Sequence, residues 1–308
     1  MGHCNTDSIY YRSWQTIKEL TDTTISMKYA HSSNIPFGAR RVCNMYRHGT
    51  LWNNKAAFRC RMRTDKDCPL CRKEDGISHI AGGCSHPTMN RMYTERHNHT
   101  GRILLKAISK GDMGSDLVMA DLGSASKCAE DEAPILPRSS LPGTIERLLD
   151  NAGYEVTKGT SRPDAIIITR WTKPIILIIG FRYCKDTQPT NQLQACRTQH
   201  TEFIKSLRQA FPTHTIKLVP IPIGHFGTIY KQCTLLASMK EVGIDCAHAI
   251  KCATKMHLDA IQQLHSIVIK TRRHLEHHRT VETPSAIRLQ QPLQRPVLAS
   301  ARSGDKPP

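Results

Sequence analysis

The sequence predicts an α/β (α+β) fold in which helices flank a mixed sheet. Two isoleucine-rich runs, residues 165–168 and 174–181, flank the polar segment Thr-Arg-Trp-Thr-Lys. This pattern is typical of two buried strands joined in a hairpin. A third apolar run at 215–223 contains two prolines, which favour an edge strand because proline has no N–H to donate to a neighbour. Segments with helical periodicity surround these runs, so strands and helices are expected to share one layered unit.

Helices are predicted on both sides of the hairpin. Thr144 is expected to cap a helix that ends at residues 151–153, where the chain reads Asn-Ala-Gly, because glycine favours a helix end. Apolar side chains at helical spacing predict further helices over 191–211, 230–242 and 247–267.

The composition divides the chain into five segments. Residues 111–142 are acidic and rich in glycine, serine and proline, which is typical of a surface linker. A short strand is expected inside it at 118–120. The C-terminal end is basic, with several prolines and few large apolar side chains, a composition typical of disorder. The predicted organisation is an N-terminal connector (1–59), a basic cysteine-containing region with an Arg-His-Asn helix (60–110), an acidic linker (111–142), a sheet domain (143–270) and a disordered basic tail (271–308).

The formal net charge of +17 indicates a polyanionic partner. Residues 40–110 contain fifteen Lys and Arg against five Asp and Glu, whereas residues 111–160 contain four against nine. A concentrated basic block favours DNA or RNA as the partner over a membrane surface. The alternative is an ordinary charged surface that keeps the protein in solution.

Neither a membrane-spanning segment nor a secretory signal is visible in the sequence. The longest apolar run is far shorter than the ~20 residues that cross a bilayer, and the N-terminus lacks an apolar core segment. Twelve cysteines in such a chain favour reduced thiols and metal binding over disulfides. We therefore expect an intracellular, nuclear protein without a membrane partner.

The segment CPLCRKEDGISHIAGGC has the ligand types and spacing of a structural zinc site. Two residues separate Cys68 from Cys71, so one tight turn can direct both thiolates to one point. His79 and Cys84 complete a Cys3His set, which leaves no open position on the metal for chemistry. The alternative is three unligated thiols and a surface histidine. Cys60 is expected to be a free thiol, although it could substitute as a ligand.

Basic side chains around the cysteines are predicted to contact phosphate. Arg96, His97 and Asn98 precede a run with helical spacing, and Asn98 is expected to cap a helix that ends near Gly111. Cations beside a helix N-terminus form an anion site, although an ordinary capped helix explains the same residues. The residues predicted to bind nucleic acid are Arg40, Arg41, Arg59, Arg61, Arg63, Arg96, His97 and Asn98.

The predicted hairpin brings an acid and a base to one end of the sheet. A turn centred near residues 171–172 places Asp164 across from Gly180. Arg182 lies on the same face as residue 180, because side chains alternate along a strand. This arrangement has the outline of a metal-dependent nuclease site in which one acid is missing. The alternative is that Asp164 is an ordinary acid at the start of a strand.

Four motifs in this order resemble the C-terminal region of non-LTR retrotransposon proteins that carry a restriction-like endonuclease. They are the Cys-Cys-His-Cys knuckle, the Arg-His-Asn element, Arg-Pro-Asp at a strand start, and a hairpin ending in GFRYCKDT. The resemblance covers residues 48–242 and implies a zinc knuckle followed by a restriction-endonuclease-like domain of the PD-(D/E)xK type. That family places a reverse transcriptase first, and no Tyr-x-Asp-Asp-like motif occurs in this sequence. We therefore expect the truncated 3′ end of such an element.

The resemblance assigns roles to the residues of the hairpin. Asp164 matches the first metal-binding acid, Gly180 stands where the second acid is expected, and Arg182 stands where the catalytic lysine is expected. Such nucleases use carboxylates to hold Mg²⁺ against the scissile phosphate. One aspartate would hold Mg²⁺ weakly, and a guanidinium cannot act as a base because it stays protonated. We expect a degenerate site that contacts phosphate and has lost cleavage. The acids that could replace the missing ligand are Glu146, Glu155 and Asp186.

Three functions are compatible with the sequence. The first is a retroelement-derived nucleic-acid-binding protein with a zinc knuckle and a degenerate endonuclease domain. The second is an active Mg²⁺-dependent DNA endonuclease that nicks target DNA for retrotransposition. The third is a zinc-dependent interaction module without a nucleic-acid role. Salt-dependent binding, metal-dependent nicking and zinc content distinguish among them.

Overall fold

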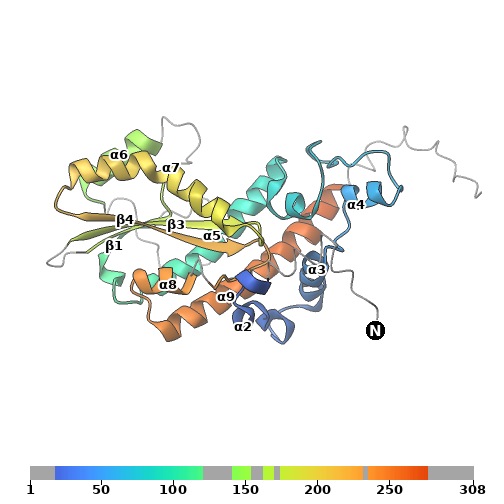
Figure 1. Ribbon diagram of the computed structural model, residues 1–308, viewed down its shortest axis with the longest axis horizontal. Coiled ribbons are helices and arrows are strands. Elements are labelled where there is room, and N and C mark those ends of the chain that lie inside the picture. Colours follow the sequence, from blue (N-terminus) through green and yellow to red (C-terminus); the bar gives the residue numbers. More distant parts are fainter. Residues whose placement is uncertain (1–17, 121–140, 154–161, 170–173, 232–234, 277–308) are drawn as a thin grey trace, which may run out of the picture.

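Four strands form one mixed sheet with helices on both of its faces (Figure 1). The computed structural model describes residues 18–120, 141–153, 162–169, 174–231 and 235–276. Strand β2 pairs antiparallel with β1 and β3, whereas β3 pairs parallel with β4. The predicted α/β class with a mixed sheet is therefore confirmed. The strands are β1 (Leu117–Ala120), β2 (Ala165–Ile168), β3 (Ile175–Cys184) and β4 (Thr215–Gly224).

The helices of the described residues surround this sheet and extend beyond it. They are α2 (Thr23–Ser26), α3 (Phe37–Arg47), α4 (Asn54–Arg59), α5 (Pro87–Ile108), α6 (Gly143–Gly153), α7 (Pro189–Ala210), α8 (Leu235–Glu241) and α9 (Cys246–His265). Short helical segments are η1 (Lys28–Ala30), η2 (His79–Gly83) and η3 (Gly114–Asp116), and η5 (Ser266–Arg273) continues α9. None of these described helices is long and apolar enough to cross a membrane.

Of the four helices predicted around the hairpin, three are confirmed with small shifts of their ends: α6, α7 and α9. The helix predicted over 230–242 differs, because α8 begins only at Leu235. Tyr230 instead forms an isolated antiparallel bridge with Thr21. That bridge attaches the N-terminal part of the chain to the segment that leaves β4.

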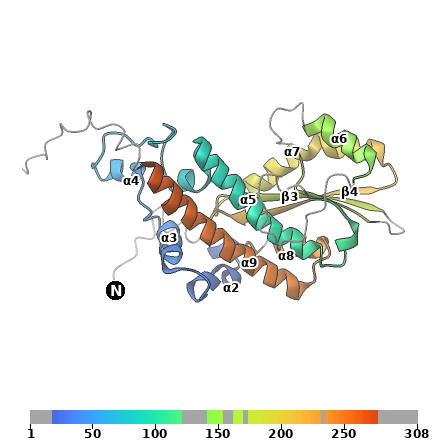
Figure 2. The same ribbon diagram turned by 180° about the vertical axis from the view of Figure 1, so that it is seen from behind.

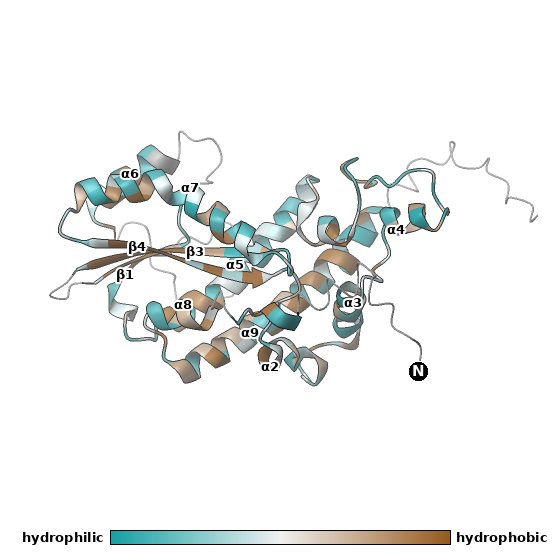
Figure 3. Cartoon of the chain, in the orientation of Figure 1, coloured by the Kyte–Doolittle hydropathy of each residue, from teal (hydrophilic) through white to brown (hydrophobic). Residues whose placement is uncertain are grey.

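The two central strands are continuously apolar because both faces of the sheet are covered. Ile176 and Ile178 of β3 pack with α6 and α7 in one core, whereas Leu177 and Ile179 pack with α5, α8 and α9 in another. Figure 1 shows α6 and α7 above the sheet and α8 and α9 below it. In Figure 3 the hydrophobic colour is concentrated in these strands. Because side chains alternate along a strand, β3 contributes apolar residues to both cores, one on each face of the sheet.

The predicted hairpin register is confirmed. Ala165 pairs with Ile179 and Ile168 with Ile176, so the preceding residue, Asp164, faces Gly180. The turn itself, residues 170–173, lies outside the described residues. Strand β4 lies at the edge of the sheet, as its prolines predict.

Part of the predicted acidic linker belongs to the sheet. The strand expected at 118–120 is present as β1, which pairs with β2. Leu117 and Met119 of β1 are buried in opposite cores. Residues 121–140 of the linker lie outside the described residues.

Helix α9 and its continuation η5 connect the sheet to the cysteine-containing region. Met256 lies in the core under the sheet, Leu264 packs with residues of α3, and Ile267 packs beside two of the cysteines. Figure 2 shows α9 beside α5 and then passing α3. Part of the predicted connector therefore packs against this helix as α2, η1 and α3.

The boundary predicted for the disordered tail, residue 271, is wrong. The helix continues to residue 276, and Arg272 is only 2% exposed. Its Nη2 lies 3.0 Å from Oδ2 of Asp75, which is also buried and also accepts from the backbone N–H of Asn54 (2.9 Å). A buried carboxylate needs such a cation, and its partner here is distant in the sequence. Residues 277–308 lie outside the described residues.

We predict that Arg272→Met destabilises the protein by about 3–5 kcal/mol, because it leaves the buried charge of Asp75 without its cation. Arg273→Met is the matched control, since Arg273 is exposed one residue further along the same helix. It should change the free energy of unfolding by less than about 0.5 kcal/mol. Urea denaturation of both variants at saturating zinc measures the difference. Equal stability of the two variants would show that the ion pair contributes nothing.

Candidate metal centre and nuclease-like site

Cys68, Cys71, His79 and Cys84 converge, with all of their ligand atoms within 4.8 Å of one another. The Sγ atoms of Cys68 and Cys84 lie 3.9 Å apart, and Cys71 Sγ lies 3.3 Å from His79 Nε2. Tetrahedral zinc with its usual bond lengths separates two sulfurs by about 3.8 Å and a sulfur and a nitrogen by about 3.5 Å. The donor types and distances therefore fit a metal such as zinc. Cys60 is exposed and outside this group.

The two halves of the metal centre are held by different parts of the chain. In the first half, the backbone carbonyl of Cys68 accepts from the backbone N–H of Arg72 (2.9 Å). This hydrogen bond closes the turn that carries Cys68 and Cys71. In the second half, Tyr93 and Arg96 of α5 donate to the backbone carbonyls of Ile80 and Ala81, both at 2.8 Å. Helix α5 therefore positions the segment that carries His79 and Cys84.

The electrostatics of the cluster favour a thiolate at one of the two closely spaced cysteines, Cys68. The hydrogen bond between the Cys68 and Cys84 thiols lowers the pKa of Cys68 and raises that of Cys84, so the pair shares one proton. Thiolates, not thiols, bind zinc. A metal would displace the remaining proton and neutralise the paired sulfurs.

The eight residues predicted to bind nucleic acid divide into exposed and internal groups. Arg41, Arg59, Arg61 and Arg63 are exposed. Arg40 is partly buried, and its guanidinium donates to the backbone carbonyls of Ser32 (3.0 Å) and Ile35 (3.1 Å). Arg40 therefore stabilises the start of α3.

The prediction that Asn98 caps a helix is wrong. Helix α5 begins at Pro87, so Arg96, His97 and Asn98 lie in its middle. Proline is well suited to a first helical position, and this is the signal that identifies the true start. Arg96 is 2% exposed, and its guanidinium lies over the Tyr183 ring, 4.1 Å from the centroid. Burial lowers the pKa of Arg96, and the side chain joins the metal centre to β3 and does not face solvent.

Asp164 is held by two neighbours at the start of β2. Its Oδ2 accepts from the backbone N–H of Phe181 (2.6 Å), and its Oδ1 lies 3.6 Å from Nε2 of His97. His97 Nε2 also lies 2.9 Å from the carbonyl oxygen of Phe181. The structure therefore places His97 beside the predicted catalytic acid, a relation that the sequence did not indicate.

The position opposite Asp164 has no room for a second carboxylate. A Cβ atom at Gly180 would lie 2.5 Å from Sγ of Cys196 and 3.5 Å from Nε2 of His200, both on α7. Arg182 faces the same helix, where it donates to Oε1 of Gln199. These contacts of α7 were not predicted from the sequence, since the residues of α7 carry no motif. Cys196 and His200 fill the space that a side chain at position 180 would need.

Asp164 belongs to no group of three or more metal-ligand side chains within the part of the chain that the structure describes. There, the one group of three or more His, Cys, Asp or Glu residues close enough to hold a metal is the Cys3His cluster. Asp186 is buried and accepts from Thr228 Oγ1 (2.7 Å) and Tyr46 Oη (3.1 Å), and burial raises its pKa to about 6. Asp186 thus connects α3 to the sheet. Glu146 lies on the first turn of α6, and Glu155 lies outside the described residues.

No family model, curated protein or solved structure matches this chain. The function is therefore argued from the geometry of the two sites.

We predict that the purified protein binds one zinc ion per chain and that Cys71→Ser loses most of it, because three ligands hold zinc less tightly than four. Cys60→Ser is the matched control, since this exposed thiol lies outside the cluster. Metal content after gel filtration, measured by mass spectrometry, tests the prediction. Equal zinc loss in both variants, or a parent protein without zinc, would contradict it.

We predict that Gly180→Ala destabilises the protein by about 1–3 kcal/mol, because the new methyl group would overlap Cys196. The double variant Gly180→Ala/Cys196→Ala should be more stable than the sum of the two single effects predicts. The difference, the coupling energy of the double-mutant cycle, should be at least about 0.5 kcal/mol. Gly143→Ala is the control, since no atom lies within 4 Å of its new Cβ. Thermal unfolding of the variants measures these terms. Strict additivity would refute the close approach of α7 to this position.

Proposed function

We propose that this protein is a zinc-containing nucleic-acid-binding protein, derived from a non-LTR retroelement, whose restriction-like endonuclease site does not cleave. A single observation carries the proposal: exposed arginines alternate with exposed apolar side chains on a segment beside the metal centre. We call this segment, residues 52–63, the basic arm. The retroelement origin rests on the order of the motifs, and it would place the protein in the nucleus with DNA or RNA as its partner.

The basic arm has the chemistry of a surface that binds a polynucleotide. Trp52 is 52% exposed, Phe58 44% and Met62 69%, so three large apolar side chains of this segment are exposed to solvent. Three exposed arginines alternate with them: Arg59, Arg61 and Arg63. Aromatic faces stack on bases, and guanidinium groups pair with phosphates. The combination suits a nucleic acid better than a purely apolar or purely anionic partner.

The metal centre fixes the position of the basic arm. The backbone N–H of Asn54 donates to Asp75, and its side-chain amide donates to the carbonyl of Asp67 (2.6 Å). Lys55 forms an ion pair with Glu74, which lies between the zinc ligands in the sequence. The partners in these bonds, Asp67, Glu74 and Asp75, lie on the same loop as the candidate metal ligands. Loss of the metal should therefore also displace the basic arm.

The absence of cleavage follows from the surroundings of Asp164. Mg²⁺ prefers near-octahedral oxygen coordination, which one carboxylate supplies poorly. Both oxygens of Asp164 already have neighbours, and Cys196 occupies the space beside Gly180. Arg182 retains a positive charge, and a guanidinium has no free lone pair with which to act as a general base. The site can therefore contact phosphate without activating water.

We predict salt-sensitive binding of labelled oligonucleotides that depends on the basic arm. Trp52→Ala should weaken binding about 5- to 100-fold, the effect of removing one stacking platform. Arg61→Ala should reduce the slope of log affinity against log salt by about 0.7–0.9, the value for one phosphate contact. Arg208→Ala, at an exposed position on α7, is the charge-matched control for the arginine variant. Fluorescence anisotropy between ~50 and ~200 mM KCl measures both quantities.

Two outcomes would contradict the proposed function. An affinity that does not change with salt, or no binding by fully zinc-loaded protein, would favour the zinc-dependent interaction module. Plasmid nicking with Mg²⁺ or Mn²⁺ by the parent protein, absent in Asp164→Ala, would show an active endonuclease. Equal nicking by both proteins would indicate a contaminating nuclease.

A further inference from the structure

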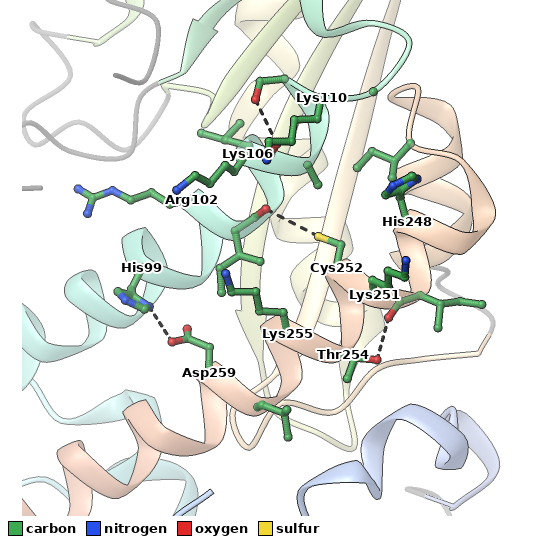
Figure 4. A pocket seen from close by; sticks show the side chains of 18 of the residues that line it. His99, Arg102, Lys106, Lys110, His248, Lys251, Cys252, Thr254, Lys255 and Asp259 are labelled. Atoms are coloured by element: carbon green, nitrogen blue, oxygen red, sulfur yellow. Dashed lines mark hydrogen bonds and ion pairs between the residues drawn. The ribbon is translucent and has the colours of Figure 1, made fainter. Parts of the chain in front are cut away.

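A basic groove lies between α5 and α9, away from both the metal centre and Asp164. Its volume is ≈920 Å³. Figure 4 shows cationic side chains along both helices that border it. Arg102 and Lys106 come from α5, Lys110 follows the end of that helix, and Lys251 and Lys255 come from α9. None of them belongs to the residues that the sequence predicted to bind nucleic acid.

The positive charge of this groove exceeds its negative charge, since six Lys and Arg line it against three Asp, which are Asp112, Asp245 and Asp259. Asp259 is engaged by His99 (2.6 Å) and by Thr100 Oγ1 (2.6 Å), and Asp245 caps the start of α9. Nε of Arg102 is buried without a hydrogen-bond partner in the same part of the chain. The groove cations that form no ion pair there are Arg102, Lys110, Lys251 and Lys255.

The cations form two regular rows. Arg102 and Lys106 lie four residues apart on α5, which places them about 6 Å apart along one face of the helix, and Lys110 follows two residues after the end of the helix. Lys251 and Lys255 have the same spacing on α9. Like charges four residues apart destabilise a helix, so each row carries a cost that an anionic ligand would offset. A repeating anion suits two such rows better than a single phosphate does.

The floor of the groove between these rows is largely apolar. Ile103 and Ala107 of α5 face it, together with Ile244, Cys252 and Leu258 from the opposite side. An apolar floor under cationic walls suits a ligand with charged groups on one side and flat apolar faces on the other. A polynucleotide strand has this character, because its bases carry little charge and its backbone is anionic at every residue.

We propose that the α5–α9 groove binds a single strand of DNA or RNA, with the phosphates on the cationic rows and the bases over the apolar floor. Helices α5 and α9 are packed against each other, so the surface groove along their junction is narrower than a stiff duplex. The inference rests on the proposed function, to which it adds a second contact surface and the form of the nucleic acid.

The double variant Lys251→Glu/Lys255→Glu tests the groove, because both side chains are exposed on α9. The control Lys205→Glu/Arg208→Glu makes the same change in net charge at exposed positions on α7, across the sheet (Figure 1). The probe is a labelled mixed-sequence oligonucleotide of about 20 nucleotides, single-stranded or annealed to its complement. Zinc content and thermal unfolding check that the variant with reversed charges is folded. If it is not, Lys251→Gln/Lys255→Gln, which removes the charges without reversing them, replaces it in the test.

The groove variant should bind the single strand at least tenfold more weakly than the control variant does. Its salt slope should fall by about 0.7 for each lost phosphate contact, while duplex affinity should match that of the control. Equal single-strand binding by groove and control variants would overturn the inference and leave the proposed function intact. An equal loss for strand and duplex would overturn the preference for single strands. A parent protein that binds neither probe would overturn the proposed function and this inference together.

Discussion

The buried ion pair between Arg272 and Asp75 unites parts of the chain that the sequence separates by almost two hundred residues. Oδ2 of Asp75 accepts from both the Arg272 guanidinium and the backbone of Asn54, so one carboxylate binds the end of the long helix and the start of α4. Neither charge can be left alone in a dry interior without a large cost in free energy. The metal-binding loop, the basic arm and the C-terminal helix must therefore reach their positions together. Helix α9 and its continuation η5 connect this region to the sheet. Ile267 packs beside the cysteines at one end, and Met256 packs in the core under the sheet at the other.

At the end of the sheet where Asp164 faces Gly180, close packing of α7 occupies the position opposite the acid. Two carboxylates at this place would repel each other and need a cation between them. With glycine at 180, helix α7 approaches β3 closely enough for Cys196 to lie where a side chain would begin. The remaining acid, Asp164, is satisfied by a backbone N–H and by His97. Under the proposed origin, a strained, metal-dependent arrangement has been exchanged for a well-packed one, the usual relation between stability and activity.

The sequence predicted the features that depend on neighbouring residues and missed those that depend on distant ones. The strand register followed from two apolar runs and a short link, and the ligand cluster followed from local cysteine spacing. Arg96 was misread because its partners, the carbonyl of Ala81 and the ring of Tyr183, come together only in the folded chain. The tail boundary failed for the same reason, since composition around Arg272 resembles a solvated segment. A count of basic residues measures charge, but it does not distinguish an exposed guanidinium from one that is buried against a ring.

Helix α5 sets the geometry in which the two proposed nucleic-acid surfaces would act. Its N-terminal half supports the metal centre through Tyr93 and Arg96, and its C-terminal half carries one cationic wall of the groove. The helix is about 33 Å long and rigid, so the basic arm and the groove keep a fixed separation. A strand long enough to reach both would bind the second surface at a high effective concentration, provided that its length matches the span. Two modest surfaces joined in this way yield tight binding without strong sequence preference, because phosphate contacts and stacking do not depend on base identity.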